Sequence, residues 1–124
     1  MTTDRLFLLI AGLFGFLAVA GGAFGAHALR ERVTVESLAI FETGARYHMY
    51  HALALAFVGI LLGRSSVNQL IWAGWLFVIG TAIFSGSLYL LTLTGTRWWG
   101  AVTPIGGVAL LAGWGTFVWG VIRS

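Results

Sequence analysis

Four long apolar runs constrain what this chain can fold into. Of its 124 residues, 59% are hydrophobic and only 9% are charged, whereas soluble domains carry about 25% charged residues. A helix needs about 20 apolar residues to cross a hydrocarbon core roughly 30 Å thick. The sequence therefore predicts an all-α integral membrane protein with a single membrane domain over residues 1–124. The expected spans cover about residues 6–28, 47–63, 70–93 and 101–122.

The first run is expected to be a retained span. No Asp, Glu, Lys or Arg interrupts the stretch from Leu6 to Leu29, which is longer than the roughly 7–15 apolar residues of a secretory signal. Ala26-His27-Ala28 looks like a small-residue cleavage site, but the run before it is too long for a signal peptide. We therefore expect this segment to stay in the protein.

The charged residues indicate topology rather than a nucleic-acid partner. All seven basic residues are arginines, and they stand singly at the ends of the apolar runs. This distribution is typical of membrane topology signals and not of a phosphate-binding face, so we predict no nucleic-acid binding. The absence of cysteine excludes disulfides, thiolate metal sites and thiol catalysis.

A short polar segment separates the first two spans. Thr34 is a suitable N-cap, and Glu36 would lie in the first turn, where the helix dipole favours an acidic side chain. Glu42 precedes Arg46 by four residues, the order that favours an ion pair, and a structural pair is the preferred interpretation. We expect an interfacial amphipathic helix over about residues 34–46. Because no proline follows it, one helix can continue into the second span with a bend.

Small residues recur at heptad spacing in three of the spans. This pattern lets membrane helices approach closely and cross at about +20°. It predicts a four-helix bundle with glycine-rich packing. The repeats are Gly15 and Gly22, Ala11 and Ala18, Gly80 and Ser87, and Gly106, Gly113 and Gly120.

The segment from Phe41 to His51 is the candidate site. Ionisable residues beside or within a membrane span are costly and are functional candidates by default. His27 closes the first span on the same side of the membrane, and the third span returns toward that side. The candidate ligand-binding residues are His27, Glu42, Arg46, Tyr47, Tyr50, His51, Ser87 and Tyr89.

Metal and catalytic chemistry are weaker interpretations of the same residues. His27, His48 and His51 could converge, and neutral imidazoles bind zinc, copper, nickel or iron. The spacing lacks the carboxylate–histidine motifs of di-iron bundles and metalloproteases, so we predict no metal and no cofactor. Ser85 or Ser87 could approach a histidine, but no nucleophile elbow or oxyanion donor accompanies them. No catalytic residue is predicted, and hydrogen-bonded histidines are the favoured interpretation.

Four sequence blocks together resemble a known family. The blocks are Gly25-Ala26-His27-Ala28-Leu29, residues 43–54, Phe84-Ser85-Gly86-Ser87-Leu88-Tyr89 and Thr103-Pro104-Ile105-Gly106-Gly107. With them the chain resembles the domain of unknown function 423 family of small bacterial proteins, which is related to animal transmembrane protein 256. The resemblance implies four spans in the bacterial inner membrane and no established activity. His27, Arg46, Tyr47, Tyr50 and His51 fall in the motif blocks of this family. Many similar sequences have glutamine at position 48, which weakens the case for a metal site that needs His48.

Three functional hypotheses follow from these residues. The leading one is a non-enzymatic membrane protein whose polar cluster binds a lipid headgroup, a small anion or a partner protein, with Arg46 supplying charge. The second is a proton-coupled transporter or channel component that works as a homo-oligomer, with the histidines and Glu42 as relay groups. The third is a metal- or haem-binding membrane protein. The expected partners are membrane lipid and a second copy of the chain.

Overall fold

The computed structural model describes residues 1–124, which form helices joined by short turns. Four helical stretches are long and apolar enough to cross a membrane. The chain is thus an integral membrane four-helix bundle, as the hydropathy predicts. The first stretch is continuous through three elements, α1, η1 and α2. The elements are α1 (Thr3–Val19), the π-helical η1 (Ala20–Gly25), α2 (Ala26–Leu29), α3 (Val35–Arg64), α4 (Asn68–Thr94) and α5 (Trp98–Arg123).

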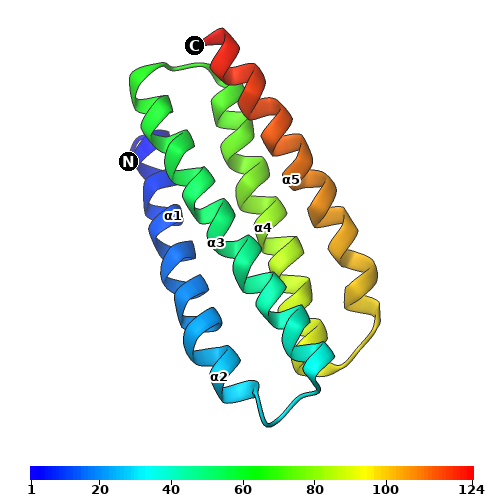
Figure 1. Ribbon diagram of the computed structural model, residues 1–124. Helices are drawn as coiled ribbons and strands as arrows, with labels where there is room; N and C mark the ends of the chain where they lie inside the picture. Colours follow the sequence, from blue (N-terminus) through cyan, green and yellow to red (C-terminus); the bar gives the residue numbers. More distant parts are fainter.

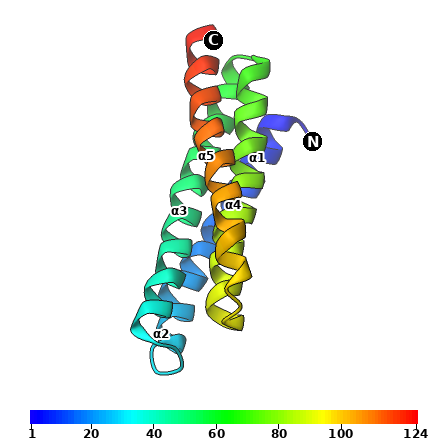
Figure 2. The same cartoon turned by 90° about the vertical axis from the view of Figure 1, so that its right-hand side faces the viewer.

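The helices are arranged as a zigzag row rather than a closed ring. α1 packs on α3, α3 on α4, and α4 on α5, while α1 touches α4 far less. Figure 1 shows α1 and α5 on the two outer sides, and Figure 2 shows all the helices running along one long axis. Both termini lie at the end of the bundle where α3 turns into α4. This order leaves two outer faces where neighbouring helices do not close over each other.

The helix ends follow local sequence signals. Thr34 caps α3 as predicted, because its side-chain oxygen accepts a hydrogen bond from the backbone N–H of Ser37 at 3.1 Å. Gly95 ends α4 with φ of 70°, a left-handed conformation that glycine adopts without strain. The segment expected as an interfacial amphipathic helix is the first part of α3, with no break before the second span. No proline or glycine pair is present there to interrupt the backbone hydrogen bonds.

α5 begins earlier than the hydropathy indicates. The helix starts at Trp98, three residues before the expected span, so Pro104 lies in its second turn. A proline there removes the backbone donor for the carbonyl four residues earlier and normally crowds it. That residue is Gly100, which has no side chain of its own to add to the crowding.

Close helix contact at glycines holds the row together, as the heptad repeats predict. A methyl group at Gly106 would lie 2.7 Å from the Phe84 Cα, and one at Gly113 would lie 2.8 Å from the Phe77 ring. The buried ring of Phe7 occupies the space over Gly74, which links α1 to α4. Gly15 is an exception, because nothing lies within 4 Å of its missing side chain.

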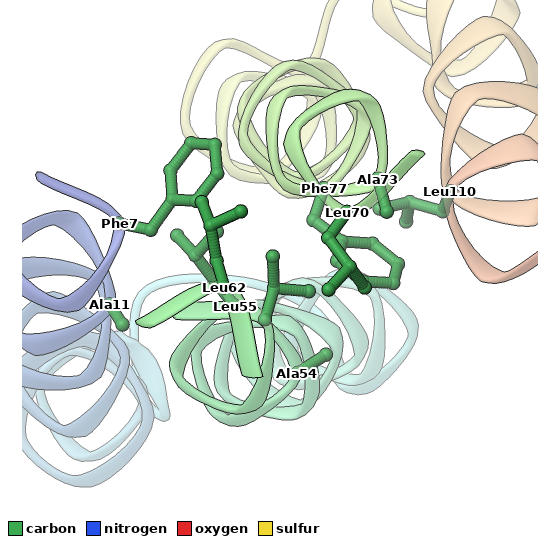
Figure 3. Packing of buried hydrophobic residues seen from close by; sticks show 10 residues of the cluster. Phe7, Ala11, Ala54, Leu55, Leu62, Leu70, Ala73, Phe77 and Leu110 are labelled. Atoms are coloured by element: carbon green, nitrogen blue, oxygen red, sulfur yellow. The ribbon is translucent and has the colours of Figure 1, made fainter. Parts of the chain in front are cut away.

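The largest apolar cluster occupies the half of the bundle next to the α3–α4 turn. Figure 3 shows its side chains reaching inward from all four spans, with Phe7 from α1 and Leu110 from α5 at its sides. The other half contains most of the polar side chains that join helices. The ten residues of the cluster are Phe7, Ala11, Ala54, Leu55, Val58, Leu62, Leu70, Ala73, Phe77 and Leu110.

The α4–α5 contact predicts a strong effect of one added methyl group. We expect Gly106→Ala to destabilise the bundle by about 1–3 kcal/mol, because the Phe84 backbone cannot move aside as a flexible side chain can. Gly115→Ala is the matched control on the same helix, because nothing lies within 4 Å of that position. Its change should stay within about 1 kcal/mol. Thermal unfolding of both variants in detergent, followed by circular dichroism, measures the difference. Equal melting temperatures would contradict the assignment of Gly106 as a close-contact site.

Candidate functional site

The zigzag arrangement creates two grooves, one on each outer face. The α3/α5 groove has a volume of about 630 Å³, and the α1/α4 groove about 430 Å³. Each contains a buried histidine of α3, because His48 and His51 are three residues apart and therefore face directions about 60° apart. The α3/α5 groove is lined by Tyr47, Tyr50, His51, Phe84, Pro104 and Trp114, among others. The α1/α4 groove is lined by Phe14, Phe41, His48, Thr81, Ser85 and Tyr89, among others.

Both ring nitrogens of His51 have hydrogen-bond partners. Nδ1 lies 2.7 Å from the backbone carbonyl oxygen of Tyr47, which can only accept. The indole N–H of Trp114 donates to Nε2 at 3.1 Å, so that nitrogen must accept. These partners assign the neutral tautomer with the proton on Nδ1. His51 therefore joins α3 to α5, and neither nitrogen has a lone pair free for a metal.

Only one ring nitrogen of His48 has a hydrogen-bond partner. Its Nδ1 lies 3.0 Å from the Tyr89 hydroxyl, which joins α3 to α4. The Phe14 ring packs edge-on against the imidazole with centroids 5.1 Å apart, and the Phe41 ring packs against Tyr89 at 5.0 Å. Aromatic rings from three helices thus surround this histidine, which was not among the predicted binding residues.

Serine and threonine hydroxyls connect the helices beyond the histidines. Ser85 donates to the Gly44 carbonyl at 2.7 Å, so α3 and α4 lie close together there. Ser87 lies 2.6 Å from the Thr103 hydroxyl of α5. Such bonds contribute about 0.6 kcal/mol each on average in membrane bundles. The hydroxyls of Ser85 and Ser87 thus link α4 to α3 and to α5.

Arg46 lies on the outer face of α3. It is exposed, as are Tyr47 and Tyr50 beside it. At 1.5 Å per residue it lies about 16 Å along the helix from Val35. Trp98 and Trp99 begin α5 at the end of the bundle where α3 starts, as expected of interfacial aromatic anchors. These tryptophans indicate that the start of α3 lies near the membrane interface. Arg46 is thus farther into the span than its position next to the charged segment in the sequence suggests.

The ion pair expected between Glu42 and Arg46 is not formed: no carboxylate oxygen lies within 4.0 Å of the guanidinium. Both side chains are exposed on the same face of α3. An exposed pair four residues apart on a helix contributes only about 0.3–0.5 kcal/mol, which barely compensates for the ordering of two long side chains. Arg46 consequently remains available to a partner from outside the chain.

His27 lies apart from the other candidates. It is exposed on α2 and lines a surface hollow with Arg30, Glu31 and Arg32. The three imidazoles therefore do not converge, because His48 and His51 point into the grooves beside α4. No group of three or more His, Asp or Glu side chains is placed to hold a metal ion. The structure thus separates the predicted residues. His27 lies on the α2 surface, Glu42 and Arg46 lie on the outer face of α3, and Ser87 lies between α4 and α5. The α3/α5 groove contains Tyr47, Tyr50 and His51, and the α1/α4 groove contains Tyr89.

Sequence reasoning missed several residues of the grooves. Trp114, the partner of His51, has no local sequence signal that connects it to the histidine, because the two are 63 positions apart in the chain. Thr81 looks like the small polar residues common in packed membrane helices, as does Thr103, which lies outside the grooves between α4 and α5. Only the pairing of α4 with α5 through the glycine repeat could have indicated that Trp114, next to Gly113, lines the α3/α5 groove.

The hydrogen bonds of His51 to Tyr47 and Trp114 predict which ring nitrogen carries the proton, and this can be measured. Trp114→Phe removes the donor to Nε2, and we expect a loss of about 1 kcal/mol of stability together with a change in the Nε2 nitrogen signal. The proton should stay on Nδ1, since the Tyr47 carbonyl oxygen beside it can only accept a hydrogen bond. Nitrogen-15 NMR of labelled histidine measures both nitrogens. Trp119→Phe, a change at a largely exposed indole of the same helix, is the control and should leave the His51 signals unchanged. A proton on Nε2 in the wild-type protein would contradict the bridge.

Comparisons with known proteins agree with the fold. A family model described as "Protein of unknown function (DUF423)" matches residues 21–107. The UPF0382 membrane protein SSP2132 of Staphylococcus saprophyticus is 43% identical over 119 residues, covering 96% of this chain and 98% of that protein. The UPF0382 inner membrane protein YgdD of Escherichia coli K12 is 40% identical over 121 residues, covering 98% and 92%.

A third relative, the UPF0382 membrane protein YwdK of Bacillus subtilis, is 42% identical over 111 residues, covering 89% of this chain and 90% of that protein. No solved structure matches the chain. None of these names indicates an enzyme family. The four spans, the sequence blocks and these relatives confirm the predicted resemblance: the chain belongs to the DUF423 family and is a multi-pass protein of the bacterial inner membrane.

Proposed function

We propose that this protein is a non-enzymatic lipid-binding protein that takes an anionic membrane lipid on the outer face of α3. The acyl chain lies in the α3/α5 groove, and the acidic headgroup contacts Arg46. The observation that carries this proposal is the exposed guanidinium of Arg46 next to Tyr47 and Tyr50, two residues that line the groove.

The energetics of a charge in a bilayer favour an anionic partner. An arginine near the centre of a span costs about 2.5–3.5 kcal/mol on insertion scales, and the cost falls when the side chain reaches the interface or pairs with an opposite charge. Arg46 forms no ion pair with Glu42, the nearest acidic residue on its face of α3. A lipid phosphate can approach it from the headgroup region with two oxygens, a geometry that guanidinium binds well.

The groove supports a lipid better than a soluble anion. Its lining is mainly hydrophobic and aromatic, with Phe84, Pro104 and Trp114 on its walls. The Tyr47 ring lies 4.9 Å from the Phe84 ring, which covers the floor with apolar surface. A soluble anion would gain nothing from these walls, whereas an acyl chain would be bound along them. The tyrosine hydroxyls at the rim can donate hydrogen bonds to ester or phosphate oxygens.

A second copy of the chain is the competing partner for the same face. Exposed α3 residues recur every three or four positions, and Glu42 and Arg46 lie one turn apart among them. In a parallel pair of chains, Glu42 of one copy could reach Arg46 of the other, as an oligomeric transporter or channel component would require. The proton-relay part of that alternative gains no support from His51, whose two nitrogens both have partners.

Arg46→Gln tests the proposal by native mass spectrometry of protein extracted gently from its own membrane. We expect the wild-type protein to retain one anionic lipid per chain, and the variant to retain it about tenfold less, which corresponds to about 1.4 kcal/mol. Arg64→Gln, a change at another exposed arginine at the far end of α3, is the matched control and should retain the lipid.

Two outcomes would contradict lipid binding at Arg46. Equal lipid retention in wild type and Arg46→Gln would remove the charge contact on which the proposal depends. A lipid-free dimer that Arg46→Gln converts to monomer would assign the face to a second copy instead.

A further inference from the structure

The α1/α4 groove contains a threonine that behaves unlike the other helical threonines. Thr81 is 2% exposed, and its hydroxyl has no hydrogen-bond partner. Such a hydroxyl normally donates to the carbonyl four residues earlier in its own helix. Five threonines of this chain do so: Thr43, Thr92, Thr94, Thr103 and Thr116. A buried hydroxyl without a partner costs about 1–3 kcal/mol, so its place in the groove requires an explanation.

His48 offers a second donor to the same groove. The Tyr89 hydroxyl has one proton, and its hydrogen-bond partner is the imidazole Nδ1 at 3.0 Å. When the phenol donates to Nδ1, the imidazole carries its proton on Nε2. No other group of the chain forms a hydrogen bond with that N–H. The groove thus holds two hydrogen-bond donors, the Thr81 hydroxyl and the His48 Nε2–H.

The two donors lie at the same height in the bundle. Ser85 of α4 is bonded to Gly44 of α3. Thr81 lies one turn before Ser85, and His48 lies one turn after Gly44 on the antiparallel neighbour. The two side chains therefore face each other across the groove, near the middle of α4, whose ends are Asn68 and Thr94.

Their depth restricts the kind of ligand. The middle of a 27-residue span is about 20 Å from either end. A long arginine side chain such as Arg46 can extend from this depth toward the headgroup region, whereas the short side chains of Thr81 and His48 cannot meet a phospholipid headgroup. A ligand there must dissolve in the hydrocarbon and still present an acceptor for both donors. An uncharged carbonyl oxygen, which has two lone pairs, meets both requirements.

The walls of the groove favour a flat ring. The rings of Phe14, Phe41 and Tyr89 line it, and its volume of about 430 Å³ lies in the range of small-molecule sites. Aromatic walls stack on flat, conjugated ligands in offset or edge-to-face arrangements. Gly86 also lines the groove, and nothing lies within 4 Å of its missing side chain, so that wall is open.

We propose that the α1/α4 groove binds a lipid-soluble quinone or a similar ring-bearing carbonyl compound, whose oxygen accepts hydrogen bonds from Thr81 and His48. The site is separate from the lipid site proposed at Arg46, because the two lie on opposite outer faces of the α3–α4 pair. It involves binding alone and no redox step.

Thr81→Val tests the proposal, because valine has the shape of threonine without the hydroxyl. The probe is 2-methyl-1,4-naphthoquinone, titrated into the full chain in lipid nanodiscs and followed by the nitrogen-15 signal of His48. We expect the variant to bind about tenfold more weakly than wild type. Its melting temperature without ligand should be unchanged or higher, since it loses an unpartnered buried hydroxyl. Thr116→Val, whose hydroxyl bonds to its own helix, is the matched control and should bind like wild type.

A second ligand and a second residue separate hydrogen bonding from simple partition into the groove. 2-Methylnaphthalene has the same rings without carbonyls and should bind wild type and Thr81→Val equally. His48→Gln keeps an N–H donor and should retain most of the affinity, whereas His48→Phe should lose it. The proposal is overturned if the quinone does not bind saturably to wild type, if Thr81→Val binds it equally well, or if wild type binds both ligands with the same affinity.

Discussion

Direct contact between helix backbones at glycines is the constraint on which this bundle depends. In a bilayer the lipid tails are as apolar as the side chains, so the hydrophobic effect does not drive spans together. Close packing must supply the attraction instead, and it does so where Gly106 meets the backbone of Phe84 and Gly113 meets the Phe77 ring. These contacts join α5 to α4 along most of its length. Because α1 packs on α3 instead, no helix closes the row, and a groove remains on each outer face.

Polar side chains form the contacts between helices in the half of the bundle that lies outside the apolar cluster. The cluster from Phe7 to Leu110 occupies the half near the α3–α4 turn. In the other half, helix contacts depend on hydroxyls and imidazoles, such as Ser85 on Gly44 and His51 between Tyr47 and Trp114. Each such group is satisfied inside the protein, which is why it can lie at membrane depth without a partner from outside. Arg46, Thr81 and the Nε2 nitrogen of His48 are the exceptions to this rule.

Much of the fold could be predicted from the sequence, whereas the site could be predicted only in part. Hydropathy predicts four spans, and the Gly106, Gly113 and Gly120 repeat predicts the face that α5 presents to α4, because both signals are local or periodic. The Thr34 cap is local in the same way. His27 and His51, which could have converged, line different hollows, because sharing one side of a membrane does not determine which way a side chain points. Thr81 could not be identified at all, since an unpartnered hydroxyl becomes visible only when every neighbour has been placed.

The two histidines of α3 show how one helix can supply two different environments. His51 faces α5, and its two partners hold it in a single tautomer, so it acts as a link between spans. His48 faces the α1/α4 groove and has one partner, the Tyr89 hydroxyl, which leaves its other nitrogen for a ligand. A glutamine at this position would offer an amide oxygen and an N–H group, so it could accept from Tyr89 and still donate into the groove. The proposed groove site thus requires one acceptor and one donor at position 48 rather than an imidazole, whereas a metal site would require the imidazole itself.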